Sequence, residues 1–308
     1  MGFFDRFYYG KAGKADYTPD DMPANRFQLF WEVLRVRIWS VMRLNLIQML
    51  FWLPCILLTI LTILAVLTVP EGQEVTEAAQ VVLPDIRGLL STYLLMLVPC
   101  LLITGPSTAA ASYVARNWAR DQHSFIWSDF KDALKDNWKQ GLLTSAITGA
   151  MPLLVYIGID FYGQLAQQQP IMVVAQTLLV ILAVIWSLAL VFIYPLMCGY
   201  KLRTRQLLRN ALLLAIGRLP FALLFRLITL LPMVIFFILT LFWGGIGILV
   251  GVIYYLLIGF GLQRLVYASF CNSVFDKFIN PNIEGAPMNL GLRTDDEDDD
   301  DEEDDTEA

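Results

Sequence analysis

Six long apolar runs constrain this chain more than any other feature. Each run is close to the roughly 20 residues that an α-helix needs to cross the hydrocarbon core of a bilayer. Hydrophobic residues make up 57% of the 308 residues and charged residues only 16%, whereas soluble domains average about 25% charged. We therefore predict an all-α, polytopic transmembrane bundle whose six spans form three hairpins. The expected spans are residues 44–69, 84–104, 142–161, 171–196, 219–243 and 246–270.

The basic residues alternate between successive loops. Lysine and arginine are frequent before the first span and after the second and fourth spans, whereas residues 70–83 and 160–170 contain neither. Because basic loops are retained in the cytoplasm, we expect a multi-pass membrane protein with both termini cytoplasmic. The formal net charge is −6. Since 12 acidic residues lie between 295 and 307, the remainder has 22 basic and 16 acidic residues.

Composition divides the chain into three regions. Residues 1–26 are rich in glycine, proline and aromatics and are expected to form an irregular cytoplasmic segment, and residues 27–279 form the six-span domain. Residues 280–308 are expected to be a loop followed by a disordered acidic tail, because the tail repels itself and has nothing to bury. The tail either provides solubilising charge or binds a basic partner or divalent cations weakly.

Amphipathic basic stretches precede the three odd-numbered spans, at residues 27–43, 124–139 and 201–218. The middle stretch has a helical apolar stripe with charged residues on the other side; the stripe consists of Trp127, Phe130, Leu134 and Trp138. Such a helix either lies in the membrane interface or packs its stripe against the ends of the protein's own spans. The sequence leaves both arrangements open, and we favour the second.

Helix boundaries around this stretch follow from local chemistry. Gly105 and Pro106 are expected to end the second span, because proline lacks an N–H and disfavours helix at the preceding residue. Ser107 or Thr108 can then cap a new helix, and Ser124 can cap the next one.

Prolines suggest an internal repeat. Pro54, Pro152 and Pro232 each lie within an odd-numbered span, and each of these spans follows an amphipathic basic stretch. The pattern predicts three units of a surface helix and a hairpin, related by an axis along the membrane normal. Chance similarity among apolar segments is the alternative explanation.

Two arginines within spans are the candidate binding residues. Arg226 lies about two turns into the fifth span and Arg264 about two turns before the end of the sixth, so both are expected at similar depth on the cytoplasmic side. An ionisable residue within a span is costly and indicates a functional site. The pair predicts a pocket for an anionic ligand or lipid headgroup. The alternative is that both side chains extend to the interface and bind nothing.

Other polar residues give weaker signals. Asn45 and Gln48 are expected to form hydrogen bonds between helices. The single histidine, His123, and the four cysteines lack metal-ligand spacing, and no group of nucleophile, base and orienting residue is evident. We therefore expect no metal, cofactor, nucleic-acid partner or enzymatic activity, and membrane lipid is the expected contact.

Two motifs carry a resemblance to a known family. The first is Gly105-Pro106-Ser107-Thr108 at the end of a span; the second contains Asp129, Phe130, Asn137, Trp138 and Lys139. Together they resemble the YesL-like family (DUF624) of bacterial integral membrane proteins, whose function is undefined. The similarity extends over residues 27–278, and the acidic tail departs from the family pattern. The resemblance implies the bacterial plasma membrane as the location and an association with carbohydrate uptake, and it implies no catalytic residues.

Two functional interpretations remain open. The protein is either an accessory or small permease component for solute uptake, with subunits of a sugar-uptake system as partners, or a non-transporting scaffold that docks a partner through its cytoplasmic helices. A continuous polar cavity would favour the first interpretation, and a sealed bundle with exposed cytoplasmic aromatics would favour the second. The oligomeric state cannot be read from the sequence.

Overall fold

The computed structural model describes residues 22–67 and 86–293, and every regular element within these ranges is helical. Six helices in this part of the chain are long and apolar enough to cross a membrane, which confirms the predicted all-α, six-span class. The expectations for residues 1–21, the loop 68–85 and the acidic tail 294–308 concern positions outside the described residues.

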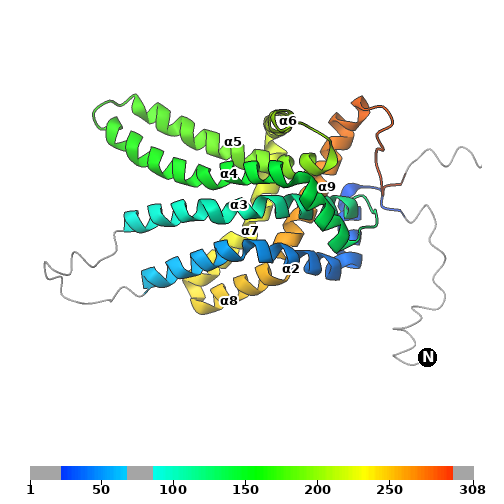
Figure 1. Ribbon diagram of the computed structural model, residues 1–308, viewed down its shortest axis with the longest axis horizontal. Helices are drawn as coiled ribbons and strands as arrows, with labels where there is room; N and C mark the ends of the chain where they lie inside the picture. The colour runs from blue at the N-terminus through cyan, green and yellow to red at the C-terminus, as the bar shows by residue number, and fades with distance from the viewer. Residues whose placement is uncertain (1–21, 68–85, 294–308) are drawn as a thin grey trace, which may run out of the picture.

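Successive long helices run in opposite directions along the molecule (Figure 1). In chain order the elements are α2 (Arg26–Leu67), α3 (Ile86–Trp118), α4 (Ile126–Ala166), α5 (Met172–Gly199), α6 (Thr204–Gly217), α7 (Leu219–Trp243), α8 (Gly245–Tyr254), the π-helix η3 (Tyr255–Gly259), α9 (Phe260–Phe278) and the 3₁₀-helix η4 (Asn280–Asn282). The basic loops predicted from the sequence meet at one end of this bundle. We call this the basic end; it comprises the first turns of α2 and α4, the last turns of α3, α5 and α9, and the helices α6 and η4.

The amphipathic stretches before the first and third spans continue directly into those spans. α2 has 42 residues and α4 has 41, so each is about 60 Å long, roughly twice the thickness of the hydrocarbon core. Arg37 has non-helical dihedrals (φ −108°, ψ 19°) and bends α2 within its amphipathic half. The third stretch forms a separate helix, α6, which is seen almost end-on in Figure 1 and therefore lies across the long helices.

The predicted end of the second span at Gly105-Pro106 is wrong. α3 continues through Pro99 and Pro106 to Trp118, with no break at Ser107 or Thr108. Proline is tolerated inside membrane helices where a neighbour satisfies the carbonyl that it leaves free, and α4 supplies such a neighbour. The predicted cap at Ser124 also differs, because the Ser124 hydroxyl donates to the side chain of Asp129 instead of capping the backbone.

The buried side chains form two clusters that meet at α9. One cluster joins α5 and α6 to Tyr267, Cys271 and Phe275. The other joins α2, α3 and the start of α4 to Leu265 and Ala268. α9 therefore contributes side chains to both clusters from adjacent faces of the helix.

The last two spans form a tight hairpin, as the sequence predicts. α7 ends at Trp243 and α8 begins at Gly245, with Gly244 at φ 54° between them. A Cβ atom at Gly247 would lie 2.3 Å from the backbone nitrogen of Thr240. The absence of a side chain at Gly247 therefore lets α8 contact the backbone of α7.

Candidate anion site and the crossing of α3 and α4

The two predicted arginines meet at one tyrosine. Arg226 on α7 donates through Nη1 to the hydroxyl of Tyr267 on α9 at 3.1 Å, and its Nε donates to Ser187 Oγ on α5 at 3.0 Å. The guanidinium carbon of Arg264 lies 5.2 Å from the centre of the Tyr267 ring. Thr229 contacts the same hydroxyl at 2.6 Å. Helices α5, α7 and α9 thus gather two cations and three hydroxyl groups at one place.

Arg264 is buried with little compensation. Only 8% of its surface is exposed, and its Nε has no hydrogen-bond partner. Its Nη2 donates to the neighbouring Gln263 at 2.9 Å, and a second ring, that of Tyr194, lies 5.9 Å away. No carboxylate within the described residues lies within 4.0 Å of either Arg226 or Arg264. Within the described residues, the two guanidinium groups therefore contact only neutral groups: hydroxyls, an amide and aromatic rings.

A second cluster, at the basic end, has its own carboxylate. Asp276 on α9 is 2.5 Å from Arg26 Nη2 and 3.9 Å from Arg120 Nη2. Asn280 donates to the other oxygen of Asp276 at 2.6 Å and accepts from the hydroxyl of Tyr200 at 2.6 Å. Burial raises the pKa of the Tyr200 phenol, although Arg116 and Arg120 nearby oppose that effect. This cluster joins the starts of α2 and η4 to the ends of α3, α5 and α9.

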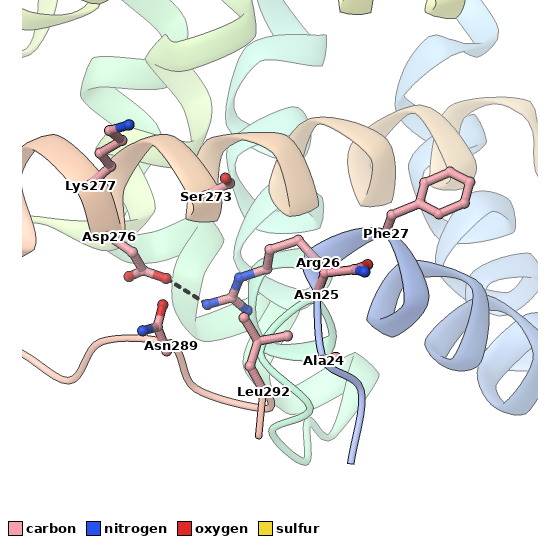
Figure 2. A pocket seen from close by; sticks show the side chains of 9 residues that line it. All are labelled: Ala24, Asn25, Arg26, Phe27, Ser273, Asp276, Lys277, Asn289 and Leu292. Atoms are coloured by element: carbon pink, nitrogen blue, oxygen red, sulfur yellow. Dashed lines mark hydrogen bonds and ion pairs between the residues drawn. The ribbon is translucent and has the colours of Figure 1, made fainter. Parts of the chain in front are cut away.

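An open cleft of about 650 Å³ lies beside Arg26. Figure 2 shows Arg26 extending from the start of α2 toward Asp276, with the loop that carries Asn289 and Leu292 on the near side. Arg26 also donates to the carbonyl oxygen of Leu290 at 2.8 Å. Arg26 therefore connects the C-terminal loop to the bundle. The positive charge of Arg26 in this cleft is already paired with Asp276.

The residues of the first family motif form a close crossing between α3 and α4. A Cβ atom at Gly105 would lie 2.1 Å from the carbonyl oxygen of Gly141. Pro106 cannot donate to Leu102, and the hydroxyl of Ser145 on α4 donates to that carbonyl at 2.8 Å. Small residues at such a crossing allow backbones to approach closely. Gly105 and Pro106 thus contribute to the close packing of α3 against α4.

The next two motif residues, Ser107 and Thr108, are also buried on α3. Ser107 donates to the Thr104 carbonyl of its own helix, and Thr108 accepts a long hydrogen bond from Gln48 on α2 at 3.5 Å. Thr108 therefore extends the contacts of this motif from α4 to α2.

The second motif begins α4 and separates into buried and exposed residues. Asp129 accepts from the backbone N–H of Phe125, the residue just before α4, at 2.9 Å, and Phe130 is buried. Asn137 donates to the Ala133 carbonyl within the same helix.

The tryptophans of the predicted stripe do not pack inward. Trp127 is 66% exposed and Trp138 is 48% exposed, and Lys139 Nζ lies 5.5 Å from the Trp138 ring. The stripe therefore packs against the protein at Phe130 and turns its tryptophans outward.

The comparison with family models matches the two helices that make this crossing. Residues 86–159 match the model described as "Protein of unknown function, DUF624". The chain carries a DUF624 segment. The predicted YesL-like resemblance is confirmed over these residues, and its wider extent stays a prediction. Neither the comparison with curated proteins nor the comparison with solved structures gave a match.

The DUF624 segment contains α3 and most of α4, including Gly105, Pro106 and Gly141. It contains neither Arg226 nor Arg264. Sequence reasoning missed Tyr267, which brings the two arginines together, and Asp276, which holds the basic end. Asp276 carried a usable signal, because it lies in a long apolar and aromatic stretch that offers few other carboxylates.

Proposed function

We propose that the protein is an accessory membrane protein that docks a cytoplasmic or membrane-bound partner at its basic end. The observation that carries this proposal is the exposure of tryptophan on the two long amphipathic halves. Trp127 and Trp138 on α4 are exposed, as are Trp31 and Trp39 on α2. Exposed aromatic side chains next to basic residues are typical of surfaces that bind other proteins.

The position of the clefts supports an accessory role over an autonomous permease. The cleft beside Arg26 and a second cleft of about 380 Å³ are both lined by residues of the basic end. The second contains Tyr200 and Phe278, at the ends of α5 and α9. A permease requires a polar path near the middle of the spans, whereas these two clefts are suited to contacts at the end of the bundle.

The YesL-like resemblance implies which partner to test first. Members of that family are associated with carbohydrate uptake, so we propose subunits of a sugar-uptake system as the partner. The two sequence interpretations then converge on a protein that assists uptake by docking. Membrane lipid is the competing contact for the same tryptophans, because tryptophan also concentrates at the membrane interface.

Site-specific photocrosslinking in native membranes distinguishes these contacts. A photoreactive residue replaces Trp127 or Trp138, and the matched control replaces Leu182, an exposed residue within α5. We expect a discrete protein adduct from positions 127 and 138 and none from position 182. Identification of uptake-system subunits in the adduct supports the full proposal. Lipid adducts alone at positions 127 and 138 would refute docking.

The proposal requires the basic end to face the cytoplasm. A reporter fused after Ala308 is expected to be active in the cytoplasm, because the loops rich in lysine and arginine are retained there. A second reporter, inserted between Gln168 and Gln169 in the turn before α5, is expected on the other side. If the reporter after Ala308 lay outside the cell and the reporter between Gln168 and Gln169 lay in the cytoplasm, the tryptophans would face outward. That result would refute a cytoplasmic partner.

A further inference from the structure

We propose that Arg226 and Arg264 bind the phosphate group of an anionic lipid from the leaflet at the basic end. This site lies among α5, α7 and α9 and does not depend on partner docking by α2 and α4. The chemistry recognised is a phosphate ester, which an inorganic phosphate ion shares. A phospholipid is the favoured source because of the surface beside the site.

The charge of the cluster provides the first argument. Two guanidinium groups approach Tyr267, and no carboxylate in the described residues lies within 4.0 Å of either. A buried charge without a counter-ion is strongly unfavourable. The Asp276 cluster shows that this chain can supply a carboxylate to buried arginines, as it does for Arg26. An anionic ligand would provide the missing negative charge at Arg264.

Unused hydrogen-bond donors provide the second argument. Arg226 uses Nε and Nη1, and Arg264 uses Nη2. Nη2 of Arg226 and Nη1 of Arg264 make no hydrogen bond within the described residues and are the donors available to a phosphate. The Nε of Arg264 also lacks a partner but is fully buried. Arginine binds phosphate oxygens through several such donors at once. The cluster thus holds donors of the number and type that a phosphate group requires.

Access to the site comes from the lipid side. Arg226 is half-buried and lies seven residues after the start of α7, about 10 Å along the helix. Its neighbours Leu223 and Leu227 on α7 are exposed, and so is Val184, one turn before Ser187 on α5. Acyl chains can lie against these apolar side chains while the headgroup contacts Arg226. A free phosphate ion would gain nothing from them.

The test measures thermal unfolding of the purified full-length protein in a neutral detergent. The probes are short-chain dihexanoyl phosphatidylglycerol, dihexanoyl phosphatidylcholine and inorganic phosphate. We expect phosphatidylglycerol near 100 times its dissociation constant to raise the melting temperature by about 5 °C. Phosphatidylcholine and phosphate are expected to produce much smaller shifts.

Variants assign the effect to the site. Arg226→Gln and Arg264→Gln should each remove most of the shift in melting temperature. Arg205→Gln also removes one positive charge, but on the exposed face of α6, and this variant should keep the full shift. Tyr267→Phe keeps both charges but deletes the hydroxyl that orients Arg226, and should weaken phosphatidylglycerol binding about fivefold. If Arg264→Gln fails to fold, Tyr267→Phe and Arg226→Gln still decide the outcome.

The possible results separate clearly. A shift with phosphatidylglycerol alone, lost in the arginine variants, supports a lipid site. An equal shift with inorganic phosphate, also lost in those variants, supports the phosphate site with a soluble ligand. No shift in the unmodified protein, or a shift that persists in both arginine variants, overturns the proposal. None of these results depends on the crosslinks at Trp127 and Trp138, so failure of one proposal can be told from failure of the other.

Discussion

The hydroxyl of Ser145 on α4 donates a hydrogen bond of 2.8 Å to the carbonyl oxygen of Leu102 on α3. This carbonyl is the one that would accept from residue 106 in an unbroken helix, and residue 106 is proline. A side chain of one helix therefore completes the backbone hydrogen bonding of its neighbour. Cys271 on α9 does the same for Val191 on α5, four residues before Pro195, at 3.3 Å.

Replacement of Ser145 by alanine should destabilise the protein by about 1 kcal/mol, because the Leu102 carbonyl loses its donor. The measurement is equilibrium unfolding in mixed detergent. The penalty should shrink in a Pro106→Ala background, where residue 106 can donate to Leu102 itself. Thr177→Ala, which removes a hydroxyl bonded only to its own helix, is the control. Equal penalties for Ser145→Ala in both backgrounds would contradict this account.

Replacement of Gly105 or Gly141 by alanine should cost about 3 kcal/mol or abolish folding, because the added Cβ would overlap the backbone of the facing helix. Gly217→Ala at the end of α6 is the matched control, because no atom lies within 4 Å of its Cβ position. The control should be neutral or stabilising by up to about 1 kcal/mol. Yield of monodisperse protein and melting temperature report both effects. A well-folded Gly105→Ala variant would show that the two helices can separate at low cost.

Replacement of Asp276 by asparagine should destabilise the protein by about 3 kcal/mol, because the buried Arg120 and the partly buried Arg26 would lose their counter-ion. Asp121→Asn removes the carboxylate of a surface pair with Arg37 at 3.4 Å and should cost less than about 1 kcal/mol. Limited proteolysis near residue 290 should also become faster, since Arg26 fastens that loop. Similar stabilities of the two variants would refute a central role for Asp276.

Replacement of Asn45 by alanine should loosen the π-helix η3. The Asn45 amide donates to the carbonyls of Tyr255 and Leu256 at 2.9 and 2.7 Å and accepts from the N–H of Gly261 at 3.0 Å. Loss of these bonds should destabilise the protein by about 2 kcal/mol and accelerate hydrogen exchange over residues 255–261.

Gln176→Ala is the control for Asn45→Ala, because Gln176 makes a single exposed bond of 3.3 Å between helices. Its stability and its exchange over residues 255–261 should stay close to those of the unmodified protein. Unchanged exchange in Asn45→Ala would show that η3 is held by packing alone.

The predictions that succeeded depend on local sequence. The turn at Gly244 follows from two glycines between long apolar runs, and the interhelical hydrogen bonds of Asn45 and Gln48 follow from polar groups that must be satisfied in an apolar setting. The common location of Arg226 and Arg264 follows from helix length and direction. In each case the prediction used a property of the residue's own segment and did not have to identify the partner, which for Asn45 lies about 210 residues away along the chain.

The predictions that failed depend on partners far along the chain. Pro106 was expected to end a helix because its rescue by Ser145 requires a crossing that only tertiary structure defines. Trp127 and Trp138 share a helical stripe with Phe130, yet only Phe130 is buried. Tyr267 could not be identified as the meeting point of the arginines, because nothing in an aromatic-rich helix distinguishes one tyrosine from another.

The position of α9 has a consequence for how the protein is made. Ribosomes release this helix after all the other spans, yet Leu265 and Ala268 complete the cluster formed by the earliest ones. The cluster among α2, α3 and α4 therefore lacks these two residues until α9 has been synthesised. A chain that stops before α9 would leave the interior between α2, α3 and α4 without the side chains that fill it.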